Sequence, residues 1–297
     1  MGYKTVLFSN PCSLFVKNRK LVYTQPDSLE KISVPLEDIS TIVIDSQQIN
    51  LTSYFISCCA EYNICVFTCN KSHIPNGIFT PFYQHSRNTK IVLNQINVKE
   101  SFKNRAWQKI IKQKIKNQSD VIRILYDRDE LDFYIGKVQS GDKTNIEGQT
   151  SKIYWNVLFD NFKRHRNDKI NTLLNWGYAI IRGTISKNIA SSGLIPCLGV
   201  KHCNELNAFN LTEDLIEPFR PFVDLTVARM QITDDESLTK DDKAQLLYIL
   251  HKQCNFKNEQ VPIQTACEKV CKSFVRSIEK SNHNLLELPC LIGGKWV

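Results

Sequence analysis

The sequence predicts an α+β protein, in which a small, mostly β domain at the N-terminus precedes a larger all-α domain. Two patterns and the chain length predict this. Short runs of β-branched and aromatic residues dominate the beginning of the chain, whereas apolar residues recur at a spacing of 3.6 from Glu100 onward. The chain has 297 residues, enough for two domains, and 42% of them are hydrophobic, enough to build real cores.

The N-terminal part alternates short strands with turns. Two strands, at 14–17 and 20–23, flank Asn18 and Arg19, a two-residue connection that favours a hairpin. A single short helix at 51–61 interrupts the strands, which argues against repeated βαβ units. Further strands are expected at 5–8, 32–36, 39–45, 65–68 and 77–82.

The polar residues 83–88 predict a linker, so we expect an N-terminal domain at 1–85 and a C-terminal domain at 86–297. In the second domain, Asp168 is expected to cap a long helix and Gly193 to end it in the left-handed conformation. Other helices are expected from Glu100 onward and at 129–137, 150–162, 241–252 and 263–280.

The chain is basic, with a net charge of +8. An excess of this kind favours a polyanionic partner, and nucleic acid is the commonest one. In the helix that begins near Glu100, a basic stripe runs beside an apolar stripe. The basic stripe consists of Arg105, Lys109, Lys112 and Lys116. We interpret it as a candidate surface for DNA phosphates; the alternative is an ordinary solvated helix face.

The eleven cysteines are expected to be reduced thiols in the cytoplasm, because no secretory leader is visible. Several of them gather close to one histidine: Cys58, Cys59, Cys65, Cys69 and His73. Their spacing matches neither paired CxxC motifs nor CxxC followed by HxxxH, so a zinc site is not favoured there. No apolar run approaches the roughly 18 residues that a membrane-spanning helix needs, so no membrane partner is expected.

Residues 199–224, GVKHCNELNAFNLTEDLIEPFRPFVD, concentrate titratable side chains. Asp214 and Glu217 are three apart, so on a helix they share a face. Asn210 is expected to cap that helix, with Glu213 closing a capping box. Two prolines follow beside these carboxylates, although proline disfavours the interior of a helix. The stretch is therefore a candidate functional site, the alternative being a solvated acidic helix start.

Common catalytic motifs are missing, because the sequence has no P-loop, Rossmann fingerprint, GxSxG elbow or HExxH motif. Glu147, His202, Asp214 and Glu217 remain as candidates near expected helix ends. Carboxylates with an imidazole suit Mg²⁺ or Mn²⁺, and the imidazole favours Mn²⁺ slightly. Such an ion could withdraw charge from a phosphodiester. Spacing alone does not bring Glu147 to His202.

Three segments carry a resemblance to a known family. They are EGQTSKIYW at 147–155, NTLLNWGYAIIRGTISKNIASSGLIPCLGVKH at 171–202 and DLIEPFRPFVD at 214–224. Together they resemble the CRISPR-associated spacer-acquisition integrases, the universal nuclease-like subunit of the adaptation module. The glutamate within DLIEPFRP resembles the type II branch. The likeness covers the expected α domain well, whereas the β domain offers no sharp motif.

The resemblance implies a β domain at 1–85 that forms a homodimer and a catalytic helical domain at 86–297. Two such dimers would flank a dimer of a small ferredoxin-like protein, forming a heterohexamer, and an effector nuclease is a further candidate partner. The implied activity is that of a metal-dependent DNA endonuclease and integrase. It inserts foreign DNA fragments as new spacers into a CRISPR array, through attack of a 3′-hydroxyl on a phosphodiester.

The family's catalytic metal triad falls on Glu147, His202 and Glu217 of this sequence. Asp214 matches an acidic position beside the triad and is expected to support it. Arg220 matches the arginine of the FRP element, and it either contacts DNA or orients Glu217; we favour orientation. Two alternatives remain open. One is a stand-alone metal-dependent DNA nuclease that uses water, and the other is a non-catalytic DNA-binding scaffold.

Overall fold

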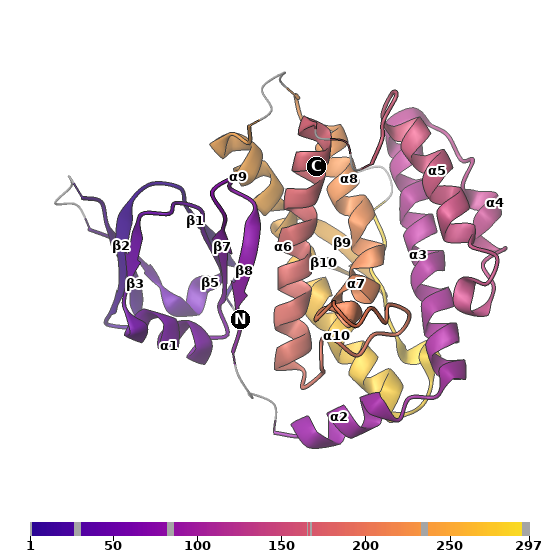
Figure 1. The fold of residues 1–297 in the computed structure, drawn as a ribbon, viewed down its shortest axis with the longest axis horizontal. Helices are drawn as coiled ribbons and strands as arrows, with labels where there is room; N and C mark the ends of the chain where they lie inside the picture. Colours follow the sequence, from indigo (N-terminus) through magenta and orange to yellow (C-terminus); the bar gives the residue numbers. More distant parts are fainter. Residues whose placement is uncertain are drawn as a thin grey trace.

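The computed structural model describes residues 2–26, 31–81, 86–164, 166, 168–232 and 237–292. Strands fill the N-terminal part and helices dominate the rest, which confirms the predicted α+β class (Figure 1). The predicted linker at 83–88 and the predicted strand end at Phe82 fall partly on 82–85, which lie outside the described residues. The domain boundary between 85 and 86 therefore stays a prediction.

Among the described residues of the N-terminal part, the strands form two four-stranded sheets. The first sheet has the order β1-β5-β7-β8, with β1, β5 and β7 parallel and β8 antiparallel. Its strands are β1 (Lys4–Phe8), β5 (Ile39–Ile44), β7 (Cys65–Cys69) and β8 (Pro75–Phe79). The second sheet has the order β4-β3-β2-β6. Its strands are β2 (Cys12–Lys17), β3 (Lys20–Thr24), β4 (Lys31–Pro35) and β6 (Ile49–Leu51).

The predicted hairpin is confirmed between β2 and β3. Lys17 pairs with Lys20, and both connecting residues, Asn18 and Arg19, have positive φ values of 51° and 58°. Left-handed conformations at both positions give a turn whose twist matches that of the flanking strands. The helix α1 (Ser53–Glu61) packs with the two sheets around a core that includes Leu14, Ile42 and Phe55.

The helix α6 (Lys169–Ser191) joins the strand-rich part to the helices. Asp168 accepts a hydrogen bond from the backbone N–H of Asn171 at 2.8 Å, and Gly193 follows the helix with φ +76°, so both predicted end signals are confirmed. Phe67 of the first sheet belongs to the same apolar core as Trp176 of α6. One face of the first sheet therefore packs on this helix.

A second, polar link holds the same two parts together. Lys243 of α9 lies 2.8 Å from Asp45, at the end of β5, and both side chains are buried. The indole N–H of Trp176 donates to the carbonyl oxygen of His73 at 3.1 Å. Breaking a buried ion pair of this kind is strongly destabilising, so it fixes the helices on the sheet.

The remaining helices complete the helical part, where some pack directly against α6 and others form a group farther from it, on the right in Figure 1. They are α2 (Asn88–Ile96), α3 (Glu100–Tyr126), α4 (Asp132–Ile135), α5 (Ile146–Leu158), α7 (Asn210–Ile216), α8 (Arg220–Ala228), α9 (Lys240–Tyr248) and α10 (Ile263–Glu279). None of the helices within the described residues is long and apolar enough to cross a bilayer. All eleven cysteines lie in the described ranges, and each is a free thiol.

Several elements differ from the prediction. The short strand β6 was not predicted, nor was the hairpin of β9 (Gln253–Phe256) and β10 (Glu259–Pro262), which lies among the helices. These strands have three or four residues each, too few to show an alternating pattern. The helix expected at 129–137 covers only Asp132–Ile135. The helix expected at 150–162 runs from Ile146 to Leu158, so it starts earlier.

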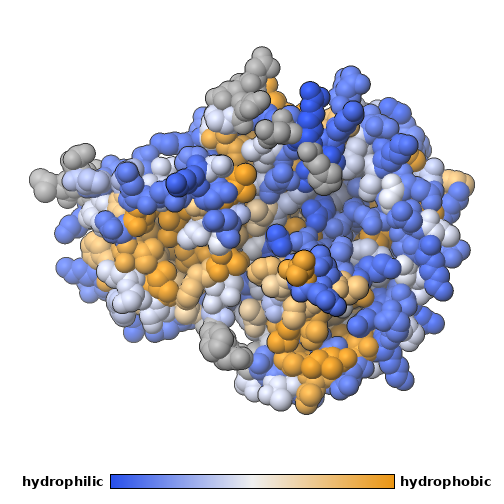
Figure 2. Space-filling view, in the orientation of Figure 1, coloured by the Kyte–Doolittle hydropathy of each residue, from blue (hydrophilic) through white to orange (hydrophobic). Residues whose placement is uncertain are grey.

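Apolar surface covers much of the strand-rich part on the face shown in Figure 2. The large apolar side chains that are exposed in this part are Tyr3, Ile32, Leu51 and Tyr54. Contiguous apolar surface on a folded protein marks candidate contact sites for other molecules.

Candidate active site

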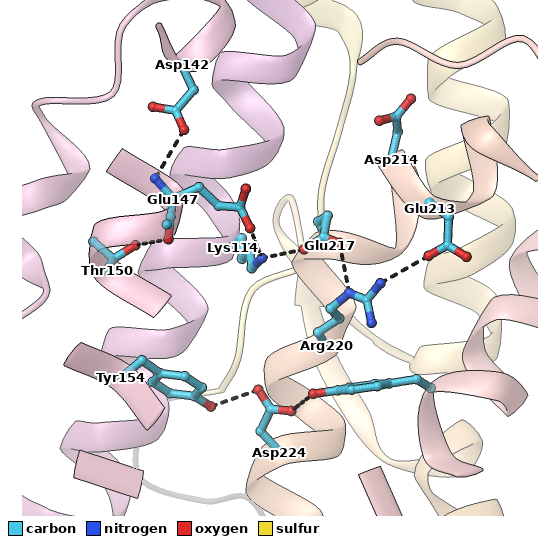
Figure 3. Close-up of polar contacts among 12 residues, drawn as sticks. Lys114, Asp142, Glu147, Thr150, Tyr154, Glu213, Asp214, Glu217, Arg220 and Asp224 are labelled. Carbon is cyan, nitrogen blue, oxygen red and sulfur yellow. Dashed lines mark hydrogen bonds and ion pairs between the residues drawn. The ribbon is translucent and has the colours of Figure 1, made fainter. Parts of the chain in front are cut away.

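A buried lysine brings two predicted site residues together (Figure 3). The Nζ atom of Lys114, midway along α3, lies 2.5 Å from Glu147 Oε1 and 2.5 Å from Glu217 Oε2. The Lys114 and Glu217 side chains are each 8% exposed, and that of Glu147 is 31% exposed. Glu147 and Glu217 are far apart in the sequence, yet they meet on one cation.

The start of α5 positions Glu147. Asp142 accepts hydrogen bonds from the backbone N–H groups of Ile146 at 2.9 Å and Glu147 at 3.1 Å. Asn145 caps the helix by accepting from the N–H of Gly148. These bonds begin the helix at Ile146, and they explain why the predicted start at 150 was wrong. Glu147 lies in the first turn, where the helix dipole favours a negative charge.

A short 3₁₀ turn (Glu217–Phe219) positions Glu217 between α7 and α8. Arg220 Nε donates to Glu217 Oε1 at 2.8 Å, and its Nη2 donates to Glu213 Oε2 at 3.1 Å. Arg182 Nε lies 2.9 Å from the other Glu213 oxygen. Glu217 therefore has the lysine on one oxygen and an arginine on the other.

These two cations keep Glu217 ionised. Burial alone would raise the pKa of this carboxyl, but the charges of Arg220 and Lys114 outweigh burial and lower the pKa to about 2. Burial likewise opposes the charge on Lys114, but Glu217 and Glu147 raise its pKa above the ordinary value. Glu217 Oε2 is buried, and its contact with Lys114 does not have the geometry of a hydrogen bond.

Asp224 and Tyr154 lie below Arg220 in the view of Figure 3, and Asp224 is hydrogen-bonded to two tyrosines. Tyr154 Oη donates to Asp224 Oδ2 at 2.9 Å, and Tyr178 donates to the other oxygen. The Arg220 guanidinium lies 4.8 Å from the centroid of the Tyr178 ring. Burial raises the pKa of Asp224 to about 7. Arg220 is thus held between the Glu217 carboxylate and an aromatic face.

His202 is oriented by Asp214. Its Nδ1 lies 2.8 Å from Asp214 Oδ1, and the fully buried carboxylate also accepts from the backbone N–H groups of Lys201 and His202, each at 3.1 Å, and of Val200. The hydrogen bond to Asp214 raises the pKa of His202, and burial opposes it. Gly199 permits this close wrapping, because a Cβ atom there would overlap the carbonyl oxygen of His202.

His202 does not join the two glutamates on Lys114. Within the described residues, no three His, Cys, Asp or Glu side chains are grouped so that they could hold a metal ion. Asp214 and Glu217 also have different partners, because α7 ends at Ile216, directly before Glu217 and Pro218 begin a 3₁₀ turn.

The predicted capping box at Asn210 is wrong. Phe209 precedes the first helical residue and makes no side-chain cap bond, whereas Asn210 lies inside the helix. The Asn210 amide instead donates to the carbonyl oxygens of Cys197 at 3.2 Å and Asn204 at 3.0 Å. Glu213 pairs with two arginines rather than with the start of the helix. Asn210 and Glu213 therefore bond to groups outside the first turn of α7 rather than to the backbone of that turn.

Sequence reasoning missed Lys114, although a signal was available. Lys114 follows Trp107, Ile110 and Ile111 by seven, four and three positions, so it lies on the apolar stripe of α3. A lysine in such a stripe must be paired where it is buried. The lysine position therefore indicated an internal anionic partner.

The predicted basic stripe lies on the other side of α3. At about 100° per residue, its members are about 160–220° around the helix from Lys114. Arg105 and Lys116 are exposed, whereas Lys109 is partly buried and its Nζ donates to the carbonyl oxygen of Asn284 at 2.9 Å. The stripe therefore does not face the two glutamates.

Comparison with known proteins identifies the family. A family model described as CRISPR associated protein Cas1 matches residues 5–253. The chain belongs to the Cas1 family. It is 34% identical over 295 residues to the CRISPR-associated endonuclease Cas1 of Neisseria meningitidis serogroup C (strain 8013), covering 97% of this chain and 96% of that one. This membership confirms the resemblance drawn from the sequence motifs.

Another Cas1 relative and two solved structures extend the likeness. The CRISPR-associated endonuclease Cas1 2 of Saccharolobus solfataricus is 26% identical over 234 residues, 73% of this chain and 71% of that one. A casposase bound to integration product has a TM-score of 0.78 at 19% identity, covering 94% and 92% of the two chains. A CAS1 protein from Thermotoga maritima has a TM-score of 0.74 at 18% identity, covering 93% and 97%. These structures share the Cas1 fold.

Proposed function

We propose that this Cas1-family chain is a metal-dependent DNA endonuclease and integrase that inserts foreign DNA fragments as new spacers into a CRISPR array. The observation that carries the proposal is that Glu147 and Glu217 both contact the ammonium group of Lys114. Arg220 binds Oε1, the other oxygen of Glu217. The relatives named CRISPR-associated endonuclease, and the casposase bound to integration product, support this chemistry.

We propose that Glu147, His202 and Glu217 hold the ion, Mg²⁺ or Mn²⁺. The chemistry of the donor set fits, because two carboxylates already share a cation and Glu217 Oε2 makes no hydrogen bond of good geometry. His202, which does not join the two glutamates among the described residues, would complete the set when the ion binds. In a neutral His202, Nδ1 would donate its proton to Asp214, so Nε2 is the nitrogen that can bind a metal ion. Metal-binding histidines usually have this arrangement. When bound, the ion would withdraw charge from a phosphodiester and lower the pKa of an attacking hydroxyl.

In the proposed reaction, the 3′-oxygen of the captured fragment forms a bond to a phosphorus atom at the repeat boundary. The bond from that phosphorus to the 3′-oxygen of the array strand breaks. The attacking hydroxyl releases a proton and the displaced oxygen takes one up, so one phosphodiester replaces another. Arg220 keeps Glu217 in position, and the low pKa of Glu217 keeps it anionic at neutral pH.

The proposed partners are DNA, a second copy of this chain and a small ferredoxin-like protein. The net charge of +8 supports DNA, and the exposed apolar side chains of the strand-rich part support self-association there. A solved Cas6-RT-Cas1–Cas2 complex has a TM-score of 0.72 to this chain, which supports a larger assembly of this kind. An effector nuclease is a further candidate, and the cytoplasm is the proposed location.

The deciding experiment supplies the chain and its small partner with Mn²⁺, a short duplex and a plasmid that carries a repeat array. We expect joined products from a duplex with free 3′-hydroxyl ends and none from one with dideoxy ends. Joining that persists with dideoxy ends would exclude attack by the 3′-hydroxyl. Cleavage of DNA without joining would favour the stand-alone nuclease.

Variants separate catalysis from binding. We expect Glu147→Gln and Glu217→Gln to abolish joining while DNA affinity is retained. Glu259→Gln is the matched control, because this exposed carboxylate lies on the β9–β10 hairpin and pairs with Lys269 of α10. Joining that survives in a folded Glu217→Gln variant with intact DNA binding would mean that Glu147, His202 and Glu217 are not the catalyst.

A further inference from the structure

We infer that Lys114 is a built-in counter-ion, which occupies the cation position between Glu147 and Glu217 until a divalent metal ion displaces it. The inference rests on the proposed metal site, because it concerns how that site is loaded. It assigns to a lysine of α3 a role in the regulation of metal binding.

The geometry supports a shared position. Lys114 Nζ lies at the same distance, 2.5 Å, from one oxygen of each glutamate. Divalent ions hold carboxylate oxygens at about 2.0–2.6 Å. An ion that used these two oxygens would therefore need the space and the electrostatic position that the ammonium group fills. Both cations cannot be there together.

Burial and charge explain why the lysine is there. Two carboxylates this close to each other repel in a site of low polarity, and a cation between them removes that repulsion. Arg220 Nε donates to Glu217 Oε1, whereas Lys114 lies at Oε2. Arg220 therefore does not take the place of Lys114 at Oε2. Lys114 therefore keeps the two glutamates assembled before a metal ion arrives.

The lysine also has the means to leave. Its ammonium group sits on a flexible four-carbon stem, so it can withdraw without movement of α3. Glu147 is 31% exposed, and this gives the shared position an open side toward solvent. A divalent ion brings twice the charge of the lysine to the same two oxygens. A metal ion that binds must therefore displace the ammonium group of Lys114. This competition lowers the apparent affinity of the site for the metal ion.

The test measures Mn²⁺ binding by calorimetry and by electron paramagnetic resonance, without DNA. We expect Lys114→Met to bind Mn²⁺ about tenfold more tightly than the unmodified chain, because a competing cation has been removed. Mn²⁺ should also raise the melting temperature of Lys114→Met more than that of the unmodified chain. Lys243→Met is the matched control, since it removes a buried lysine paired with Asp45; its Mn²⁺ affinity should not change.

Equal or weaker Mn²⁺ binding by Lys114→Met would overturn the inference. Failure of the proposed metal site gives a different result, in which Glu147→Gln and Glu217→Gln leave the Mn²⁺ affinity of the unmodified chain unchanged. If Lys114→Met does not fold, Lys114→Gln keeps a side chain of similar shape without the charge. In the unmodified chain with ¹⁵N-labelled lysines, the ion-paired Nζ signal of Lys114 should disappear as Mg²⁺ is added, and a signal that persists at saturation would also overturn the inference.

Discussion

The Nδ1 atom of His202 lies 2.8 Å from Asp214 Oδ1, and the Asp214 carboxylate is fully buried. The same carboxylate accepts from the backbone N–H groups of Val200, Lys201 and His202. Asp214 therefore fixes both the loop that carries the imidazole and the orientation of the ring. In neutral His202 this arrangement places the proton on Nδ1 and the lone pair on Nε2.

This relationship predicts the effect of Asp214→Asn. The amide N–H₂ of asparagine would face backbone N–H donors, so the loop and the imidazole should lose their positions. We expect Mn²⁺ affinity to fall about 10–100-fold and the free energy of unfolding to fall by about 1–3 kcal/mol. Asp242→Asn is the control, because Asp242 is also buried but pairs with Lys169 and closes the capping box of α9 with Thr239. Unchanged Mn²⁺ affinity in a folded Asp214→Asn variant would remove Asp214 from the proposed site.

Arg220→Lys separates the two roles considered for this arginine. Arg220 contacts Glu213 and Glu217 at once, and a lysine cannot reproduce this planar fork. If Arg220 orients Glu217, joining should fall about 100-fold, since small misplacements of catalytic groups cost this much. Affinity for DNA should stay the same, and Arg182→Lys, which affects contacts with Glu213 and the Phe209 ring rather than a contact with Glu217, should have a smaller effect. A parallel loss of DNA affinity and joining would instead identify Arg220 as a DNA contact.

The basic stripe of α3 gives a prediction about DNA binding away from the glutamates. Replacing Lys112 and Lys116 by glutamine should weaken DNA binding and reduce the slope of log affinity against log salt by about 1 for each lost phosphate contact. Lys109→Gln should change the slope less, because its Nζ already donates to Asn284. If the slope is unchanged in all variants, the basic stripe does not contact DNA phosphates and is an ordinary solvated helix face.

Local signals in the sequence were enough to predict most of the fold. Asp168 and Gly193 fix the ends of α6 through bonds and conformations that involve only their neighbours. The start of α5 was not predicted, because it depends on the carboxylate of Asp142 as well as on the Asn145 cap. Short strands such as β9 and β10 depend on pairing with each other rather than on their own pattern.

The candidate site was predictable in part. The motifs named Glu147, His202 and Glu217 through a resemblance, but they gave no information about the cation between the two glutamates. Lys114 comes from α3, and only tertiary packing brings this helix against both α5 and the 3₁₀ turn at Glu217. Contacts between distant segments of this kind depend on the whole fold and not on the spacing within one motif.

Gly183 tests the packing of α6 on the first sheet. A Cβ atom at Gly183 would overlap the buried ring of Phe67. Although alanine favours helices over glycine, we expect Gly183→Ala to lower the free energy of unfolding by about 1–3 kcal/mol, because the core is overpacked. Urea denaturation measures this. Gly136→Ala is the control, since a Cβ atom there would meet open space and the backbone is helical; it should be neutral or slightly stabilising. Adding Phe67→Leu should restore part of the lost stability, and no restoration would contradict the overlap as the cause.

Asp224 predicts how stability depends on pH. Its pKa is raised from 3.8 to about 7 in the folded chain, chiefly by burial. Between these values the unfolded chain releases the proton while the folded chain keeps it, so stability from this group is present below pH 3.8 and is lost as pH rises to about 7. At about 1.4 kcal/mol per pH unit, the loss amounts to about 4 kcal/mol.

Urea denaturation of Asp224→Asn across this range checks the prediction. The asparagine cannot ionise, so the difference in unfolding free energy between the variant and the unmodified chain should shift in favour of the variant as pH rises from 4 to 7. Asp242→Asn is the control, because the pKa of Asp242 is shifted in the opposite direction. Burial would raise this pKa, but hydrogen bonds from Lys169 and Thr239 lower it. Its contribution is present above the ordinary pKa and is lost only at lower pH, so its curve should parallel that of the unmodified chain between pH 4 and 7. A parallel curve for Asp224→Asn would mean that Asp224 is ionised in the folded chain throughout this range.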